Sequence, residues 1–174
     1  MLLVELIVPN TSVISALYVL NCFEHFRQIS CKRSWEIAIP TIVAEELSKH
    51  RGYLSFRKEI PLETFNVDNN SLDQMKNRFP ALADGELAVL FVTLNFRNFK
   101  KEANSASAIL DDKAARNVAK RLGVRYFGTL KLLSELLREG LVTKLQFKQY
   151  IKKLQDSGFY FNERILIEIV GKDS

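Results

Sequence analysis

Apolar and polar residues alternate along the chain in blocks that predict strands followed by helices. The run LLVELIV at 2–8 is apolar enough for a strand buried on both faces, as in a parallel sheet. Apolar residues then recur at helical spacing to about Phe26. The same order follows with WEIAIP at 35–40 as a strand and 41–52 as a helix that we expect Gly52 to end.

The rest of the chain repeats this alternation and predicts an α/β fold. Parallel strands need a connecting element between them, so strands separated by helices indicate a mostly parallel sheet covered on both faces. The further predicted strands are 62–67, 107–112 and 124–128, and the further predicted helices are 71–80, 82–96, 112–123, 129–140 and two more in the last forty or so residues.

The chain length of 174 residues suits one domain, which we place at 1–174 with a core at 1–140 and a helical extension at 141–174. No apolar run reaches the roughly 20 residues that cross a bilayer, and the start lacks a basic leader, so we expect a cytoplasmic protein without membrane contact. Cys22 and Cys31 match no common zinc spacing and are expected to be buried thiols.

The charge is unevenly placed. The net charge is +5, but the stretch 113–153 has eleven basic residues against Glu135 and Glu139, a net +9 that leaves −4 elsewhere. Such a stretch suits a polyanionic substrate or an acidic protein partner. An ordinary solvated helix surface explains it equally well.

Acidic residues gather where predicted strands end or helices begin. The amide Asn10 follows the first strand, Glu46 lies in the helix after the second, and Asp111 and Asp112 follow the apolar residues AIL of the strand predicted at 107–112. Ligands of open α/β sheets bind outside the carboxyl ends of the strands. Clustered carboxylates repel one another, and Mg²⁺ or Mn²⁺ would relieve that repulsion and serve phosphodiester hydrolysis.

Each polar residue also has a structural explanation. Thr11 or Ser12 could cap the first helix, Asp112 could cap another, and Asp84 and Glu86 could favour the dipole of the helix at 82–96. Their joint placement nevertheless favours one acidic site. A dinucleotide fold is not indicated, because the first turn has no glycine.

In five segments the sequence resembles the PIN domains, specifically the VapC-like ribonucleases of prokaryotic toxin–antitoxin systems. The resemblance covers about the first 140 residues. The segments are VPNTSVISAL, IPTIVAEEL, LADGELAVL, ILDDKAARNVAKRLGVRYFGTLKLL and REGLV.

The resemblance implies a three-layer α/β/α domain in which four acids hold one or two Mg²⁺ or Mn²⁺ ions and cut RNA. It also implies an antitoxin-like protein partner. For the free chain we expect a homodimer, the default among oligomers, with apolar helices such as LYVLNCF at 17–23 as a self-association face. In this sequence Glu46 matches the second acid, Glu86 the third with Asp84 as a substitute, and Asp112 the fourth with Asp111 adjacent. Residues expected to give RNA or polar support are Thr11, Ser12, Lys113, Arg116 and Thr129.

Asn10 departs from the resemblance, because the family has aspartate there. Asparagine keeps an oxygen ligand but removes one negative charge, so weaker metal binding follows. Three interpretations stay open: a natural module of low or no activity, a substitution engineered to silence a nuclease, or an active enzyme whose other acids compensate. An inactive PIN-fold module that binds RNA or an antitoxin-like protein is the alternative function.

Overall fold

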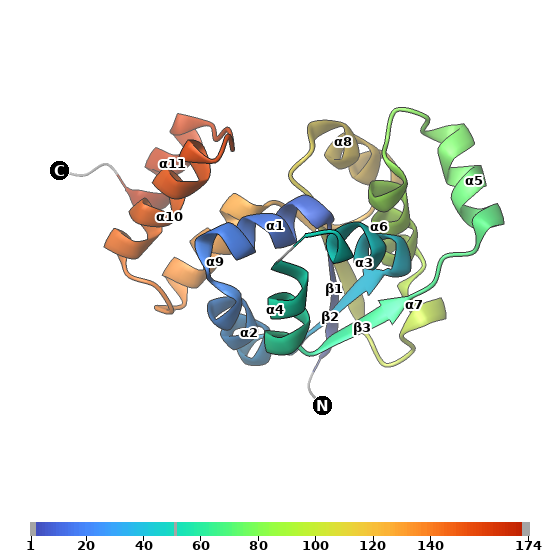
Figure 1. The fold of residues 1–174 in the computed structure, drawn as a ribbon, viewed down its shortest axis with the longest axis horizontal. Helices are drawn as coiled ribbons and strands as arrows, with labels where there is room; N and C mark the ends of the chain where they lie inside the picture. Colours follow the sequence, from blue (N-terminus) through green and yellow to red (C-terminus); the bar gives the residue numbers. More distant parts are fainter. Residues whose placement is uncertain (1–2, 51, 172–174) are drawn as a thin grey trace.

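A five-stranded, entirely parallel sheet forms the centre of the molecule, with strand order β3-β2-β1-β4-β5 (Figure 1). The computed structural model describes residues 3–50 and 52–171, so the predicted strand start at residue 2 lies outside the described residues. Every strand pairing is parallel, which confirms the α/β prediction. The strands are β1 (Glu5–Pro9), β2 (Trp35–Pro40), β3 (Leu62–Phe65), β4 (Ser105–Ile109) and β5 (Tyr126–Phe127).

Helices follow each strand and cover both faces of the sheet. Leu6, Ile7 and Val8 point alternately to the two faces of β1, yet none of them is exposed. The helices are α1 (Thr11–Leu20), α2 (Phe23–Lys32), α3 (Thr41–Ser48), α4 (Gly52–Glu59), α5 (Asn69–Arg78), α6 (Asp84–Leu94), α7 (Phe96–Phe99), α8 (Lys113–Leu122), α9 (Thr129–Arg138), α10 (Lys144–Asp156) and α11 (Glu163–Val170).

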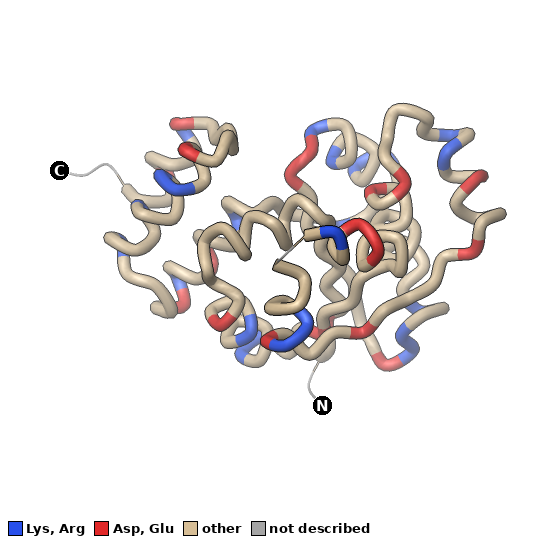
Figure 2. Tube along the Cα trace, viewed as in Figure 1, with Lys and Arg blue, Asp and Glu red and all other residues tan. Residues whose placement is uncertain are grey.

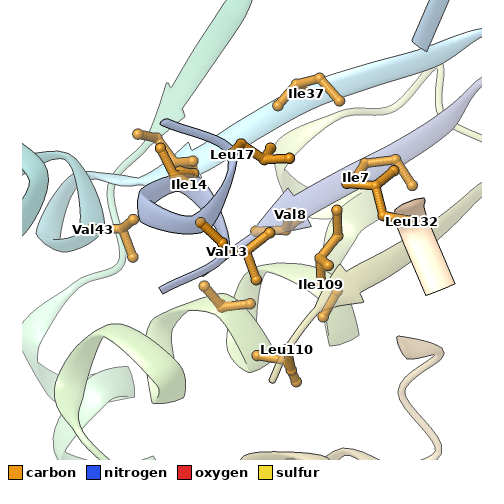
Figure 3. Close-up of a cluster of buried hydrophobic side chains, with 14 of the residues drawn as sticks. Ile7, Val8, Val13, Ile14, Leu17, Ile37, Val43, Ile109, Leu110 and Leu132 are labelled. Atoms are coloured by element: carbon orange, nitrogen blue, oxygen red, sulfur yellow. The ribbon is translucent and has the colours of Figure 1, made fainter. Parts of the chain in front are cut away.

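The core is built between the central strands and the helices that cross them. Figure 3 shows Ile14 and Leu17 of α1 near the sheet, and Leu132 of α9 beside Ile7 of β1. Each such buried side chain contributes about 1.5–3 kcal/mol relative to exposure. Helix α6 is apolar nearly all round and packs against β1, β2 and β4, as expected of a buried helix.

The sheet has its topological switch point between β1 and β4. The chain leaves β1 for β2 and β3 on one side, and returns to β4 and β5 on the other. Pro9 pairs with Ile109, so β1 and β4 end at the same level. Open α/β sheets bind ligands at such a point, outside the carboxyl ends of the strands. The fold therefore places Asn10 and the residues after Ile109 side by side.

Two predicted helix boundaries are wrong. The first helix stops at Leu20, because Asn21 adopts a left-handed conformation with φ of 53° and its N–H closes the last turn on Tyr18. Gly52 begins α4 instead of ending α3. A Cβ at Gly52 would lie 2.5 Å from Tyr18 Cγ, so the close approach of the Tyr18 ring requires glycine there.

The C-terminal helices pack on the end of the molecule formed by α1 and α9. Phe147, Ile151 and Leu154 of α10 are buried in that contact, whereas no residue of α11 is fully buried. None of the helices in the described part of the chain is long and apolar enough to cross a bilayer.

The two cysteines differ. Cys22 is buried, and burial raises the pKa of its thiol to about 12, as expected of an inert core thiol. Cys31 is exposed, so the prediction of a second buried thiol is wrong. Cys31 lies on the outer side of α2, whose buried positions are Phe23, Phe26, Ile29 and Ser30.

Candidate active site

Asn10 joins the end of β1 to the start of α1 at the switch point. Its backbone N–H donates to the Ile109 carbonyl at 3.1 Å, and its Oδ1 accepts from the Thr11 N–H at 2.6 Å. Only 6% of Asn10 is exposed. Asn10 is therefore the cap of α1, in place of the Thr11 or Ser12 that the sequence offered. Aspartate caps a helix as well as asparagine does, so the cap alone does not explain the amide.

Glu46 reaches the same region from α3. Its carboxylate accepts a hydrogen bond from the Thr11 hydroxyl and lies directly against Gly85 in the first turn of α6. A Cβ at Gly85 would lie 2.7 Å from Glu46 Oε1, closer than van der Waals contact. Thr11 and Gly85 together fix Glu46 between the start of α1 and the start of α6.

Glu86 lies in the first turn of α6, where its Oε2 accepts from the Ala83 N–H at 3.0 Å. Partial burial raises the pKa of Glu86, the negative charges of Asp112 and Glu46 raise it further, and the Ala83 hydrogen bond opposes them. Glu46, Glu86 and Asp112 therefore form one electrostatic group, which we call the acidic cluster. Its members come from α3, α6 and the residue before α8.

The adjacent aspartates 111 and 112 have different surroundings. Asp112 is exposed and caps α8 by accepting from the Ala115 N–H at 2.8 Å. Asp111 uses both carboxylate oxygens on the buried Thr129, accepting from its N–H at 2.7 Å and its hydroxyl at 2.6 Å. Asp111 thus ties the end of β4 to the start of α9. Asp112 has the freer carboxylate.

The remaining candidate residues divide between structural contacts and open surface. Asp84 pairs with Lys76 at 2.7 Å, so its charge is already balanced. Ser12 is half-buried in the first turn of α1. Lys113 and Arg116 begin α8, and neither is paired with a carboxylate in the described part of the chain.

Gly85 is a residue of the site that the strand-end pattern of polar residues does not reveal. Glycine inside a helix costs about 1 kcal/mol relative to alanine, and the sequence places it between two acids in the first turn of an otherwise apolar helix. A helical glycine at such a position indicates close approach of another group. Here that group is the Glu46 carboxylate.

The donor chemistry of the acidic cluster fits a hard divalent cation. Among the described residues, no three His, Cys, Asp or Glu side chains lie close enough together to hold a metal ion directly. Mg²⁺ does not need three, because it keeps several waters and binds through one or two carboxylates together with substrate phosphates. The raised pKa of Glu86 marks negative charge that a cation would offset.

A solved structure and a family model are similar to this chain. A solved PilT N-terminus domain protein from the hyperthermophilic archaeon Sulfolobus solfataricus P2 matches with 17% identity and a TM-score of 0.48, over 76% of this chain and 93% of that one. Among curated proteins, none matches the chain significantly. The model of the family DUF3368, described as a PIN domain, matches residues 6–173. The chain therefore belongs to the PIN-domain family.

Proposed function

We propose that this protein is a VapC-like endoribonuclease that cuts RNA with Mg²⁺ or Mn²⁺ at the acidic cluster. The observation that carries the proposal is geometric: the Glu46 carboxylate lies against Gly85 in the same helical turn as Glu86, and Asp112 follows the strand at the switch point of the sheet. Three carboxylates brought together without a balancing cation repel one another and destabilise the fold. Such destabilising arrangements are typical of functional sites.

Glu46, Glu86 and Asp112 would hold the metal ion, one or two of them directly and the rest through its bound waters, with the Asn10 carbonyl oxygen as a neutral neighbour. A bound ion supplies an activated water and neutralises charge on the phosphate. Thr11 orients Glu46 by donating its hydroxyl hydrogen, and the Asp111–Thr129 contact fixes the strand end that carries Asp112. Because Asn10 leaves the site one charge short, we expect weak metal binding and low activity.

A non-catalytic module that binds RNA or an antitoxin-like protein is the second candidate. It is favoured by Asn10 itself, whose only side-chain oxygen already accepts a hydrogen bond from Thr11. An antitoxin-like partner could place an Arg or Lys in the acidic cluster where a metal would otherwise lie. Self-association as a homodimer could use the exposed Tyr18 of α1 and Leu54 of α4.

The deciding experiment is Asn10→Asp. The substitution keeps the α1 cap and adds a charged ligand, so metal-dependent RNA cleavage should rise on the order of a hundredfold, equivalent to a few kcal/mol of transition-state stabilisation. Both forms are compared on an RNA panel with Mg²⁺, with Mn²⁺ and with chelator. Cleavage by neither form supports the binding module, and equal cleavage by both makes Asn10 only a helix cap.

Metal binding is also measured without activity. Mn²⁺ should raise the melting temperature of Asn10→Asp more than that of the chain with Asn10, because a ligand that binds only the folded state stabilises it. The matched control is Glu46→Gln in the Asn10→Asp background, which should lose this shift. An equal shift in all three forms would place the metal elsewhere.

A further inference from the structure

Helix α8 carries four basic residues and no acidic residue. Ala115, Val118 and Ala119 turn toward the core. With 3.6 residues per turn, Lys113 and Lys120 fall opposite these positions, and Arg116 and Arg121 fall on the two flanks of the helix.

Unlike other cations of the basic stretch, those of α8 are not used to hold the fold together by ion pairs. Lys131 and Arg138 of α9 both pair with Glu135, and Arg125 lies 3.4 Å from Glu5. In the described part of the chain, none of the four α8 cations lies within ion-pair distance of a carboxylate. Within the basic stretch, Arg125 and the cations of α9 are thus balanced by carboxylates, whereas those of α8 are not.

A fifth cation joins this surface from α5. The guanidinium carbon of Arg121 lies 5.5 Å from the centroid of the Phe79 ring, and that of Arg78, the last residue of α5, lies 5.1 Å from it. Both guanidinium groups are thus held by the same aromatic ring, and neither pairs with a described carboxylate. We call Arg78, Lys113, Arg116, Lys120 and Arg121 the α8 basic surface.

The α8 basic surface lies beside the acidic cluster. Lys113 directly follows Asp112, and α8 packs on α6, whose first turn carries Glu86. Figure 2 shows basic segments on α8 and near the end of α5, with an acidic segment at the start of α6 between the two helices and another at the start of α8. A polyanion bound along the α8 basic surface would therefore extend to the acidic cluster.

We propose that the α8 basic surface binds the phosphate backbone of single-stranded RNA and guides it into the acidic cluster. The identity of the polyanion rests on the proposed function. Phosphates bind to spaced cations without needing apolar anchors, whereas protein interfaces are centred on exposed aromatic or aliphatic residues. No large hydrophobic residue of α5 or α8 is exposed in the described chain, which favours nucleic acid over an acidic protein.

Binding is tested with a fluorescent oligouridylate of about twelve nucleotides, titrated in chelator over a series of salt concentrations. Lys113→Gln/Lys120→Gln should weaken binding about tenfold and flatten the log–log salt slope by about 1.4, since each lost single-strand phosphate contact removes about 0.7. The matched control is Lys144→Gln/Lys152→Gln on α10, which removes the same charge and should change neither quantity. Equal weakening by both pairs would reduce the effect to net charge and overturn the proposal.

A second pair, Arg78→Gln/Arg121→Gln, tests the end of the surface that is far from Asp112, and circular dichroism checks its folding. It should weaken RNA binding to a similar extent. Polyglutamate that displaces RNA as effectively as unlabelled RNA would assign the surface to an acidic protein. Because binding is measured without metal, it is independent of cleavage. If the α8 variants bind RNA more weakly but the chain never cleaves RNA, the RNA-binding surface stands and the proposed nuclease activity is wrong. If the variants bind RNA as well as the unsubstituted chain and the chain cleaves RNA with metal, the nuclease stands and the RNA-binding surface is wrong.

Discussion

Two groups of partly buried glutamates lie in this molecule, and their surroundings are opposite. The acidic cluster combines Glu46, Glu86 and Asp112 with no cation paired to them in the described chain. The second group, which we call the ion network, links α2 to α9 through Arg33. Arg33 binds Glu135 at 2.5 Å and Glu139 at 2.8 Å.

The pKa directions follow from the balance of charge. Burial opposes ionisation of Glu135, but hydrogen bonds from Lys131 and Arg33 outweigh it and lower the pKa. Hydrogen bonds from Lys32 and Arg33 lower the pKa of Glu139 to about 2. In the acidic cluster the pKa of Glu86 is raised instead. Ionised glutamates therefore stabilise the fold in the ion network, whereas ionised Glu86 in the acidic cluster destabilises it.

The largest effect should come from breaking the acidic cluster. In the Asn10→Asp background, Glu46→Gln should lower metal-dependent RNA cleavage at least about a hundredfold, because it removes a charged ligand while keeping the shape. The melting temperature should change little. Glu45→Gln, on the same helix but exposed, is the matched control and should keep its activity. Equal activity of the two variants would exclude Glu46 from the site.

Breaking the ion network should act on stability instead. Glu135→Gln leaves Arg33, Lys131 and Arg138 without their shared buried partner, so we expect a loss of about 2 kcal/mol and a melting temperature lower by about 4–8 °C. Glu24→Gln, which removes an exposed pair with Arg27, should cost well under 1 kcal/mol. Similar losses from both substitutions would show that the network has no special role.

Gly85→Ala should lower activity without lowering stability. The added Cβ must displace the Glu46 carboxylate, which is the mobile end of a flexible side chain, so activity should fall about tenfold. The melting temperature should stay level or rise by about 2 °C, since alanine favours a helix. In a Glu46→Gln background the same substitution should cause no further loss of activity, and an additive loss would contradict the contact.

The smallest expected effect is a pH-dependent change in melting temperature, which tests the opposite pKa shifts of Glu86 and Glu139. A folded pKa above the unfolded value gives stability that is lost as pH rises through it, so ionised Glu86 destabilises the protein at neutral pH. Glu86→Gln keeps an acceptor for the Ala83 N–H and should raise the melting temperature at pH 7 by about 1 °C. The gain should vanish below the ordinary glutamate pKa of 4.5.

Glu139→Gln should show the opposite dependence. A depressed folded pKa gives stability that is present above 4.5 and is lost as pH falls toward about 2. The melting temperature of this variant at pH 7 should therefore lie below that of the unsubstituted chain, and the difference should close in acid. Parallel curves for Glu86→Gln and Glu139→Gln would refute the contrast between the two groups.

Strand and helix order could be predicted from the sequence because hydrophobic periodicity is local. The strands at 35–40 and 107–112 and the helices at 112–123 and 129–140 lie within a few residues of their observed positions. Two helix ends were predicted wrongly, that of the first helix near Phe26 and that of the following helix at Gly52. At Gly52 the deciding contact is with Tyr18, which is distant in the sequence and so leaves no local pattern.

By itself the sequence determined the order of strands and helices, and it placed Asn10 and the acids at the strand ends and helix starts where a parallel sheet binds ligands. Only the tertiary structure decided which of those groups act together. It tied Asp111 to Thr129, paired Asp84 with Lys76, seated Glu46 on Gly85, and left α8 without counter-charges. The physical reason is that local sequence sets backbone conformation, whereas charge balance depends on neighbours that the fold brings together from distant segments.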